Sequence, residues 1–102
     1  MPISLGCVEG KVRIVNGPSA FKSFKKGEIL VTKFLTPDYA SVVHKAKGVV
    51  ADVGGMTSHA AVVVRELGIP CLVGVKGASL ILKNGDKVKL DAGKGTLDIL
   101  SA

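Results

Sequence analysis

The 102-residue chain is 47% hydrophobic but only 4% aromatic, so we expect one compact core of valine, isoleucine, leucine and alanine. Its apolar stretches fall far short of the roughly 20 residues of a membrane span, and no signal-peptide pattern opens it, so we expect a cytoplasmic protein without membrane contact. The net charge of +6 comes from lysines spread from Lys11 to Lys94. This spread is typical of a solvated surface rather than a nucleic-acid-binding block, although attraction for phosphates or an acidic partner is an alternative interpretation.

The first half of the chain predicts two strands and a helix. Residues 6–15 are rich in small and β-branched side chains and end at an Asn-Gly-Pro stop, which predicts an opening strand. Residues 29–34 predict a second strand after a polar turn. Residues 36–48 then predict a helix, because Thr36 suits the N-cap, proline suits the first helical position, and Gly48 suits the end.

The middle of the chain predicts a strand, a helix and another strand. Residues 48–51 are short and uniformly apolar, as in a strand buried on both faces, and a glycine pair follows. A helix is predicted from near Thr57 to Leu67, with Gly68 as its terminator. Residues 71–75 again predict a buried strand, so this part of the sheet is expected to be parallel.

The last quarter predicts antiparallel strands. Asn84-Gly85 is a turn dipeptide, and residues 86–90 alternate polar and apolar side chains. Residues 93–95 separate them from a last strand over residues 96–100. The whole is predicted to be one α/β domain over residues 1–102.

The two cysteines and the carboxylates predict no metal centre. Cys7 and Cys71 are far apart in sequence and form neither a disulfide framework nor a four-ligand zinc motif, so both are predicted to be buried free thiols. No carboxylates show metal-ligand spacing. We therefore expect no metal or cofactor on this chain.

The segment with the strongest chemical signal runs from Gly54 to His59, between a buried strand and a helix. Glycines there let the backbone approach a ligand, and the free N–H groups of the first helical turn point toward an anion. A neutral imidazole is a nucleophile, and the positive end of a helix dipole disfavours its protonated form. The same dipole would stabilise a phosphorylated His59. From spacing alone, however, a lone histidine near a helix start is more often a capping or packed residue.

The wider sequence resembles the mobile, phosphohistidine-carrying domain of phosphoenolpyruvate-utilising enzymes such as pyruvate phosphate dikinase, phosphoenolpyruvate synthase and enzyme I. The resemblance rests on residues 54–61, 65–70 and 73–74, and weaker matches extend it over essentially the whole chain. It implies a swivelling β/β/α three-layer fold with His59 as the phosphoryl acceptor. It also implies that ATP or phosphoenolpyruvate is the donor and that a pyruvate-type compound is the acceptor.

Members of this family are usually long chains, which sets expectations about partners. The resemblance implies an ATP-grasp nucleotide-binding domain and a phosphoenolpyruvate- or pyruvate-binding barrel, in the same parent chain or in separate subunits. The Mg²⁺ of the reaction is then expected on those partner domains. This chain alone should be incomplete as a catalyst.

The neighbours of His59 carry separate expectations. Gly54, Gly55, Thr57 and Ser58 are candidates for phosphate binding or support. Thr57 can cap the helix, and in dikinase-like members the matching threonine is a regulatory phosphorylation site. Ser58 either bonds phosphate or faces solvent.

Two further side chains are expected to be structural. Arg65 lies about 240° around the helix axis from His59, so a pair with Asp52 or Glu66 is expected rather than phosphate contact. His44, near the end of the first predicted helix, is expected to be structural too. The alternative to a carrier is a non-catalytic interaction or regulatory module that kept the fold and the anion pocket.

Overall fold

The computed structural model describes residues 2–4, 6–33, 37–52, 59–75 and 77–101. Within them a mixed sheet has the strand order β1-β5-β4-β3-β2-β6-β7. The strands are β1 (Pro2–Ser4), β2 (Cys7–Ile14), β3 (Ile29–Thr32), β4 (Gly48–Ala51), β5 (Cys71–Val73), β6 (Lys87–Asp91) and β7 (Thr96–Ser101). The helices are η1 (Pro18–Ser23), η2 (Pro37–Tyr39), α1 (Ala40–Val43), α2 (His59–Leu67) and α3 (Ala78–Ile81), where η marks 3₁₀ geometry.

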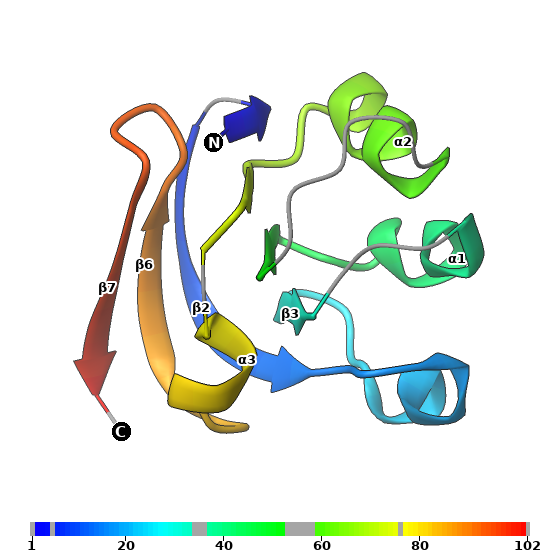
Figure 1. The fold of residues 1–102 in the computed structure, drawn as a ribbon, viewed down its shortest axis with the longest axis horizontal. Helices are drawn as coiled ribbons and strands as arrows, with labels where there is room; N and C mark the ends of the chain where they lie inside the picture. Colours follow the sequence, from blue (N-terminus) through cyan, green and yellow to red (C-terminus); the bar gives the residue numbers. More distant parts are fainter. Residues whose placement is uncertain (1, 5, 34–36, 53–58, 76, 102) are drawn as a thin grey trace.

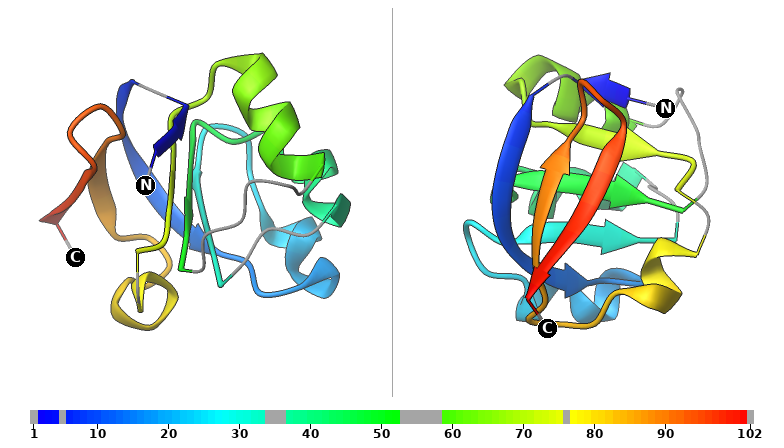
Figure 2. Two further views of the ribbon diagram at one scale, coloured as in Figure 1. Left: turned by 45° about the horizontal axis from the view of Figure 1, so that its top comes forward. Right: turned by 90° about the vertical axis from the view of Figure 1, so that its left-hand side faces the viewer.

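The sheet curls because β2 belongs to both of its halves. The first part of β2, Cys7–Lys11, pairs antiparallel with β6, whereas Val12–Ile14 pairs parallel with β3. The parallel order continues from β3 through β4 to β5, and β1 and β7 close the ends as antiparallel strands. Figure 2 shows the β6–β7 hairpin folded across the parallel strands, with α1 and α2 on the opposite side.

Two hydrophobic clusters separate the three layers. One lies between the parallel strands and the helices and includes Leu30, Val43 and Val64. The other lies between the two β layers and includes Val50 and Leu90. The parallel strands β3, β4 and β5 are buried at every position because both of their faces are covered. This β/β/α arrangement confirms the predicted fold class (Figure 1).

The first predicted helix is much shorter in the structure than residues 36–48. Thr36 lies outside the described residues, and α1 itself ends at Val43. The chain beyond it bonds to the segment before β3: Gly27 N–H donates to Lys45 O at 2.9 Å, and Lys47 N–H donates to Glu28 O at 3.0 Å. These bonds take the backbone groups that a longer helix would need, so the prediction of a helix to Gly48 was wrong.

Gly48 belongs to β4 and allows the two β layers to approach. A Cβ atom there would lie 3.0 Å from the side chains of both Val8 and Leu90, which come from the other layer. The glycine that was predicted to end a helix therefore serves close packing of a strand.

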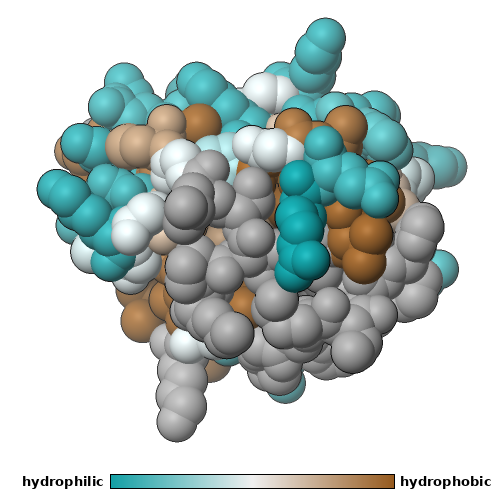
Figure 3. All heavy atoms as spheres, turned by 90° about the horizontal axis from the view of Figure 1, so that it is seen from above, coloured by the Kyte–Doolittle hydropathy of each residue, from teal (hydrophilic) through white to brown (hydrophobic). Residues whose placement is uncertain are grey.

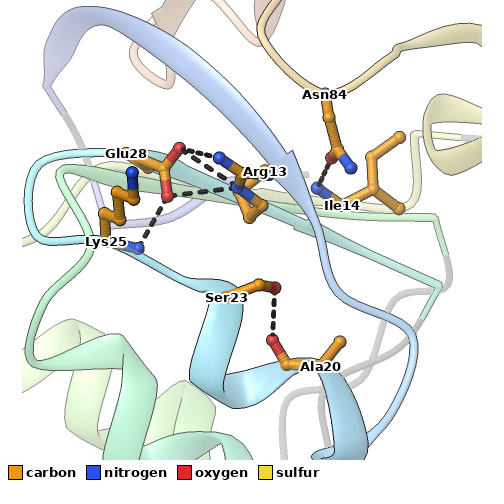
Figure 4. Close-up of polar contacts among 7 residues, drawn as sticks. All are labelled: Arg13, Ile14, Ala20, Ser23, Lys25, Glu28 and Asn84. Atoms are coloured by element: carbon orange, nitrogen blue, oxygen red, sulfur yellow. Dashed lines mark hydrogen bonds and ion pairs between the residues drawn. The ribbon is translucent and has the colours of Figure 1, made fainter.

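The start of β3 is held to β2 by an ion pair. Arg13 donates to both carboxylate oxygens of Glu28, with its Nη2 at 3.0 Å from Oε2 (Figure 4). Glu28 also accepts the backbone N–H of Lys25 at 2.6 Å. On the other side of β2, the side chain of Asn84 accepts the N–H of Ile14 at 2.6 Å. Side chains thus fix β2 to the segments on both sides.

Three elements of the structure were not predicted. β1 is a three-residue strand that pairs antiparallel with β5, η1 is a six-residue 3₁₀ helix after β2, and α3 is a four-residue helix after β5. The other predicted strands, including the final hairpin over β6 and β7, are confirmed. No helix in the described parts of the chain has the length and apolarity to cross a membrane.

Candidate functional site

The candidate histidine, His59, comes after β4 in the chain, and β4 ends at the edge of the sheet where the parallel strands end. β4 ends at Ala51, and α2 begins at His59. Since β3, β4 and β5 are parallel, Thr32, Ala51 and Val73 lie at the same edge (Figure 2). Ligands of α/β proteins bind at such carboxyl edges. Four of the predicted site residues lie outside the described residues: Gly54, Gly55, Thr57 and Ser58. The side chain of His59 also lies outside the described part of the chain.

The start of α2 suits an anion. His59 is its first residue, which agrees with the predicted place of this histidine in the first helical turn. The first turn of α2 contains no acidic residue, so no carboxylate of that turn offsets the positive end of the helix dipole. The N–H groups of a first turn have no partner within their own helix and can bind a phosphate.

Packing on three sides holds α2. Val64 is fully buried and Val63 partly buried in the cluster beneath the helices. The helix lies against α1, η2 and β1. It ends at a left-handed glycine: Gly68 has φ +70°, its N–H donates to Arg65 O, and Ile69 N–H donates to Val64 O. These two bonds form a Schellman motif, which confirms the predicted terminator.

A buried hydrogen-bond network lies beside the site edge. The hydroxyl of Tyr39 accepts from Thr32 Oγ1 and from the N–H of Gly17, each at 2.9 Å, and donates to the carbonyl of Val15 at 2.8 Å. Thr32 and Tyr39 are both almost fully buried. Sequence analysis missed both residues, although a hydroxyl at the end of an apolar strand and the single tyrosine of the chain are visible signals.

Backbone bonds fix the point where the chain leaves β4 toward His59. The N–H of Asp52 donates to the carbonyl of Thr32 at 3.1 Å, and the N–H of Val75 donates to the carbonyl of Ala51 at 3.2 Å. The last residues of β3, β4 and β5 are therefore tied together. Asp52 directly follows β4 and His59 begins α2, so the described ends of the segment between them adjoin elements that are held by several contacts.

The predicted structural side chains lie at the surface. Arg65 is exposed in the last turn of α2, and its pairing with Asp52 or Glu66 stays a prediction. His44 is exposed and caps the C-terminal end of α1. No hydrogen bond between described residues joins Arg65 or His44 to the start of α2.

The two thiols differ, contrary to the prediction that both are buried. Cys71 is buried in β5, and this burial raises the pKa of its thiol to about 12. Cys7 is exposed because it lies on the solvent face of β2, which it shares with Glu9 and Lys11. Both are free cysteines, as predicted.

The surface also has an apolar cavity. A cavity of about 210 Å³ opens between β5, α3 and β7 and is lined by aliphatic side chains and a glycine. Its lining offers no side-chain donor or cation, so it does not suit phosphate. On the face that Figure 3 shows, hydrophilic residues lie beside patches of apolar ones. Among the described residues, no three His, Cys, Asp or Glu side chains gather as a metal site requires.

Comparison with known proteins identifies the family of this domain. Residues 24–95 match the family model described as PEP-utilising enzyme, mobile domain. The chain belongs to this family. A relative from Staphylothermus marinus, a probable phosphoenolpyruvate synthase, is 42% identical over 99 residues that cover 95% of this chain. A rifampicin phosphotransferase from Bacillus cereus is 37% identical over 101 residues, 98% of this chain.

The mobile domain is a small part of these relatives. The chain spans 12% of the Staphylothermus protein and 11% of the Bacillus protein. A solution structure of Enzyme I has the same fold, with a TM-score of 0.66 and 29% identity over 78% of this chain and 33% of that one. The mobile domain therefore occurs in proteins with much additional chain.

Proposed function

We propose that this mobile domain is a phosphoryl carrier in which His59 accepts a phosphoryl group at one partner site and passes it on at another. The observation that carries the proposal is the place of His59: it opens α2, after the carboxyl end of β4, in a member of the PEP-utilising family. A nucleophile there faces an electrostatic environment that favours a transferred anion.

The chemistry is a pair of displacements at phosphorus. In the first, an imidazole nitrogen of His59 attacks the donor, an N–P bond forms, and the bond from phosphorus to the donor's bridging oxygen breaks with its electron pair leaving on that oxygen. In the second, an acceptor oxygen attacks the same phosphorus and the N–P pair returns to the imidazole. Each step replaces one bond to phosphorus by another, so the protein's part is positioning and charge stabilisation.

Several residues are proposed to support the phosphoryl group. Gly54 and Gly55 would let the backbone approach it, and Thr57 and Ser58 would offer hydroxyl donors, with Thr57 also a candidate regulatory site. Arg65 is proposed only as structural support, since it lies at the far end of α2. The Mg²⁺ of the reaction is proposed to bind to partner domains, and neither displacement described above uses a metal ion on this chain.

The donor and acceptor belong to partners under this proposal. An ATP-grasp-type domain would supply ATP chemistry, and a barrel domain would hold phosphoenolpyruvate or pyruvate. Support comes from relatives named phosphoenolpyruvate synthase or probable phosphoenolpyruvate synthase. The relative named rifampicin phosphotransferase acts, by its name, on a different acceptor.

The test supplies the missing partner domains. The purified chain is mixed with the Staphylothermus phosphoenolpyruvate synthase from which the matching region has been removed, and with radiolabelled ATP or phosphoenolpyruvate. We expect one phosphoryl group per chain that is labile in acid and stable in alkali. His59→Ala should abolish the label and keep the fold, whereas His44→Ala, which removes the exposed histidine at the end of α1, should leave it unchanged.

A small phosphoryl donor removes the dependence on docking. Phosphoramidate should modify His59 in the absence of any partner. Labelling that persists in His59→Ala, or a wild-type chain that neither donor system modifies at this residue, would favour a non-catalytic interaction module instead.

A further inference from the structure

The hydroxyl of Tyr39 joins three separate segments next to the site. It accepts hydrogen bonds from Thr32 at the end of β3 and from the N–H of Gly17 before η1, and it donates to Val15 after β2. All of its hydrogen-bonding capacity is thus used within the protein. The tyrosine is 3% exposed, so water does not compete for these bonds.

The same residue belongs to the 3₁₀ helix that packs against α2, which carries the candidate nucleophile. Tyr39 is the last residue of η2, and η2 packs against α2. Its ring meets Phe21 of η1 edge-to-face, with centroids 4.9 Å apart. Tyr39 therefore connects the ends of β2 and β3, through its hydroxyl, with the element on which α2 rests.

The other end of this connection leads to the strand before His59. Thr32, which donates to the Tyr39 hydroxyl, accepts the N–H of Asp52 through its carbonyl. Asp52 is the last described residue before the segment that leads to α2. Both described ends of that segment, Asp52 and His59, are thus linked to Tyr39.

We propose that Tyr39 is a positioning residue: its hydroxyl fixes α2, and with it His59, relative to the carboxyl edge of the sheet. The inference rests on the proposed carrier function, because the position of His59 matters to a transfer step that needs near-attack geometry. A displacement of about 1 Å can cost such a step about a hundredfold in rate.

The test compares Tyr39→Phe with the wild-type chain in two measurements. In the first, amide hydrogen exchange is measured by NMR. We expect faster exchange in α2, by about tenfold, and unchanged exchange in β6, because the lost bonds loosen the support of α2 locally. In the second, phosphoryl transfer with the partner domains should lose kcat by about ten- to a hundredfold with KM unchanged. Modification of His59 by phosphoramidate should stay within about twofold, because that reaction needs no docked geometry.

Matched variants separate positioning from general stability. Thr32→Ser keeps the hydroxyl and should behave as wild type, whereas Thr32→Val should reproduce Tyr39→Phe. Val88→Ala opens a space between the two β layers, away from this network, and should speed exchange in β6 while leaving the transfer rate unchanged.

The outcomes distinguish the two proposals. Wild-type exchange in α2 of Tyr39→Phe, or a wild-type transfer rate in a chain that is labelled on His59, would overturn the positioning role. If the wild-type chain is never labelled on His59, the carrier function fails instead, and the exchange measurement alone decides whether Tyr39 holds α2.

Discussion

Cys71 lies in β5 with its thiol enclosed by the cluster beneath the helices. Burial disfavours the thiolate, which raises the pKa from the ordinary 9.0 to about 12 in the folded protein. The unfolded chain ionises at the ordinary value. The contribution of the neutral thiol to stability is therefore complete below pH 9 and is lost as the pH rises from about 9 toward 12.

This difference predicts an alkaline loss of stability that depends on one side chain. Above pH 9.0 the wild-type free energy of unfolding should fall by up to about 1.4 kcal/mol per pH unit more than that of Cys71→Ala. Urea unfolding of both proteins under reducing conditions, at a series of pH values, measures it. Lysine titration affects both chains and cancels in the comparison. Parallel pH profiles would refute the assignment.

Single residues were predictable where the sequence encodes a local signal. His59 was singled out as a candidate because a glycine pair, a helix start and an apolar run surround it in sequence, and the family resemblance decided the choice. Thr32 and Tyr39 were missed because their hydrogen bonds join segments 7 and 24 residues apart, which no local pattern reveals. Cys7 was misjudged because its exposure depends on which face of β2 the hairpin leaves open.

At the scale of elements, the end of α2 offers a clean test of backbone conformation. Gly68 has φ +70°, and a Cβ atom added there meets no atom within 4 Å. Gly68→Ala should therefore cost about 1–2 kcal/mol through the left-handed backbone alone. Gly93, whose φ is not in that region and whose added Cβ would touch Asp91 at an ordinary 3.4 Å, is the matched control.

Chemical unfolding of both variants checks this prediction. Gly93→Ala should change the free energy of unfolding by no more than about 0.5 kcal/mol. Equal losses in the two variants would show that the left-handed conformation is not what makes Gly68 necessary.

Elements were predictable in proportion to their length and periodicity. The parallel strands, α2 and the final hairpin followed from apolar runs and turn residues. The shortened α1 did not, because its end is decided by hydrogen bonds from residues 45 and 47 to the segment before β3. β1 and α3 span three and four residues, too few to show a period.

The fold as a whole places His59, the candidate nucleophile, after the carboxyl edge of the parallel strands. Long-range pairing of β2 with both β3 and β6 produces the two β layers, and the helices cover the other face of the parallel strands. The fold class was predicted through the family resemblance, whereas the curl of the sheet depends on register that sequence patterns do not encode. In this architecture α2 lies on the helical face of the parallel strands.

The most direct test of the account is the location of phosphate in the protein isolated from its native cell. Lys47 and Arg65 are consecutive tryptic sites, so one peptide, residues 48–65, contains His59, Thr57 and Ser58, whereas His44 falls in another. The protein is purified and digested at mildly alkaline pH and fragmented by electron transfer in the mass spectrometer. If His59 is the phosphoryl carrier, this peptide should have a phosphoryl group on His59 that disappears after brief acid treatment. Phosphate found on Thr57, Ser58 or His44 with His59 unmodified would contradict it.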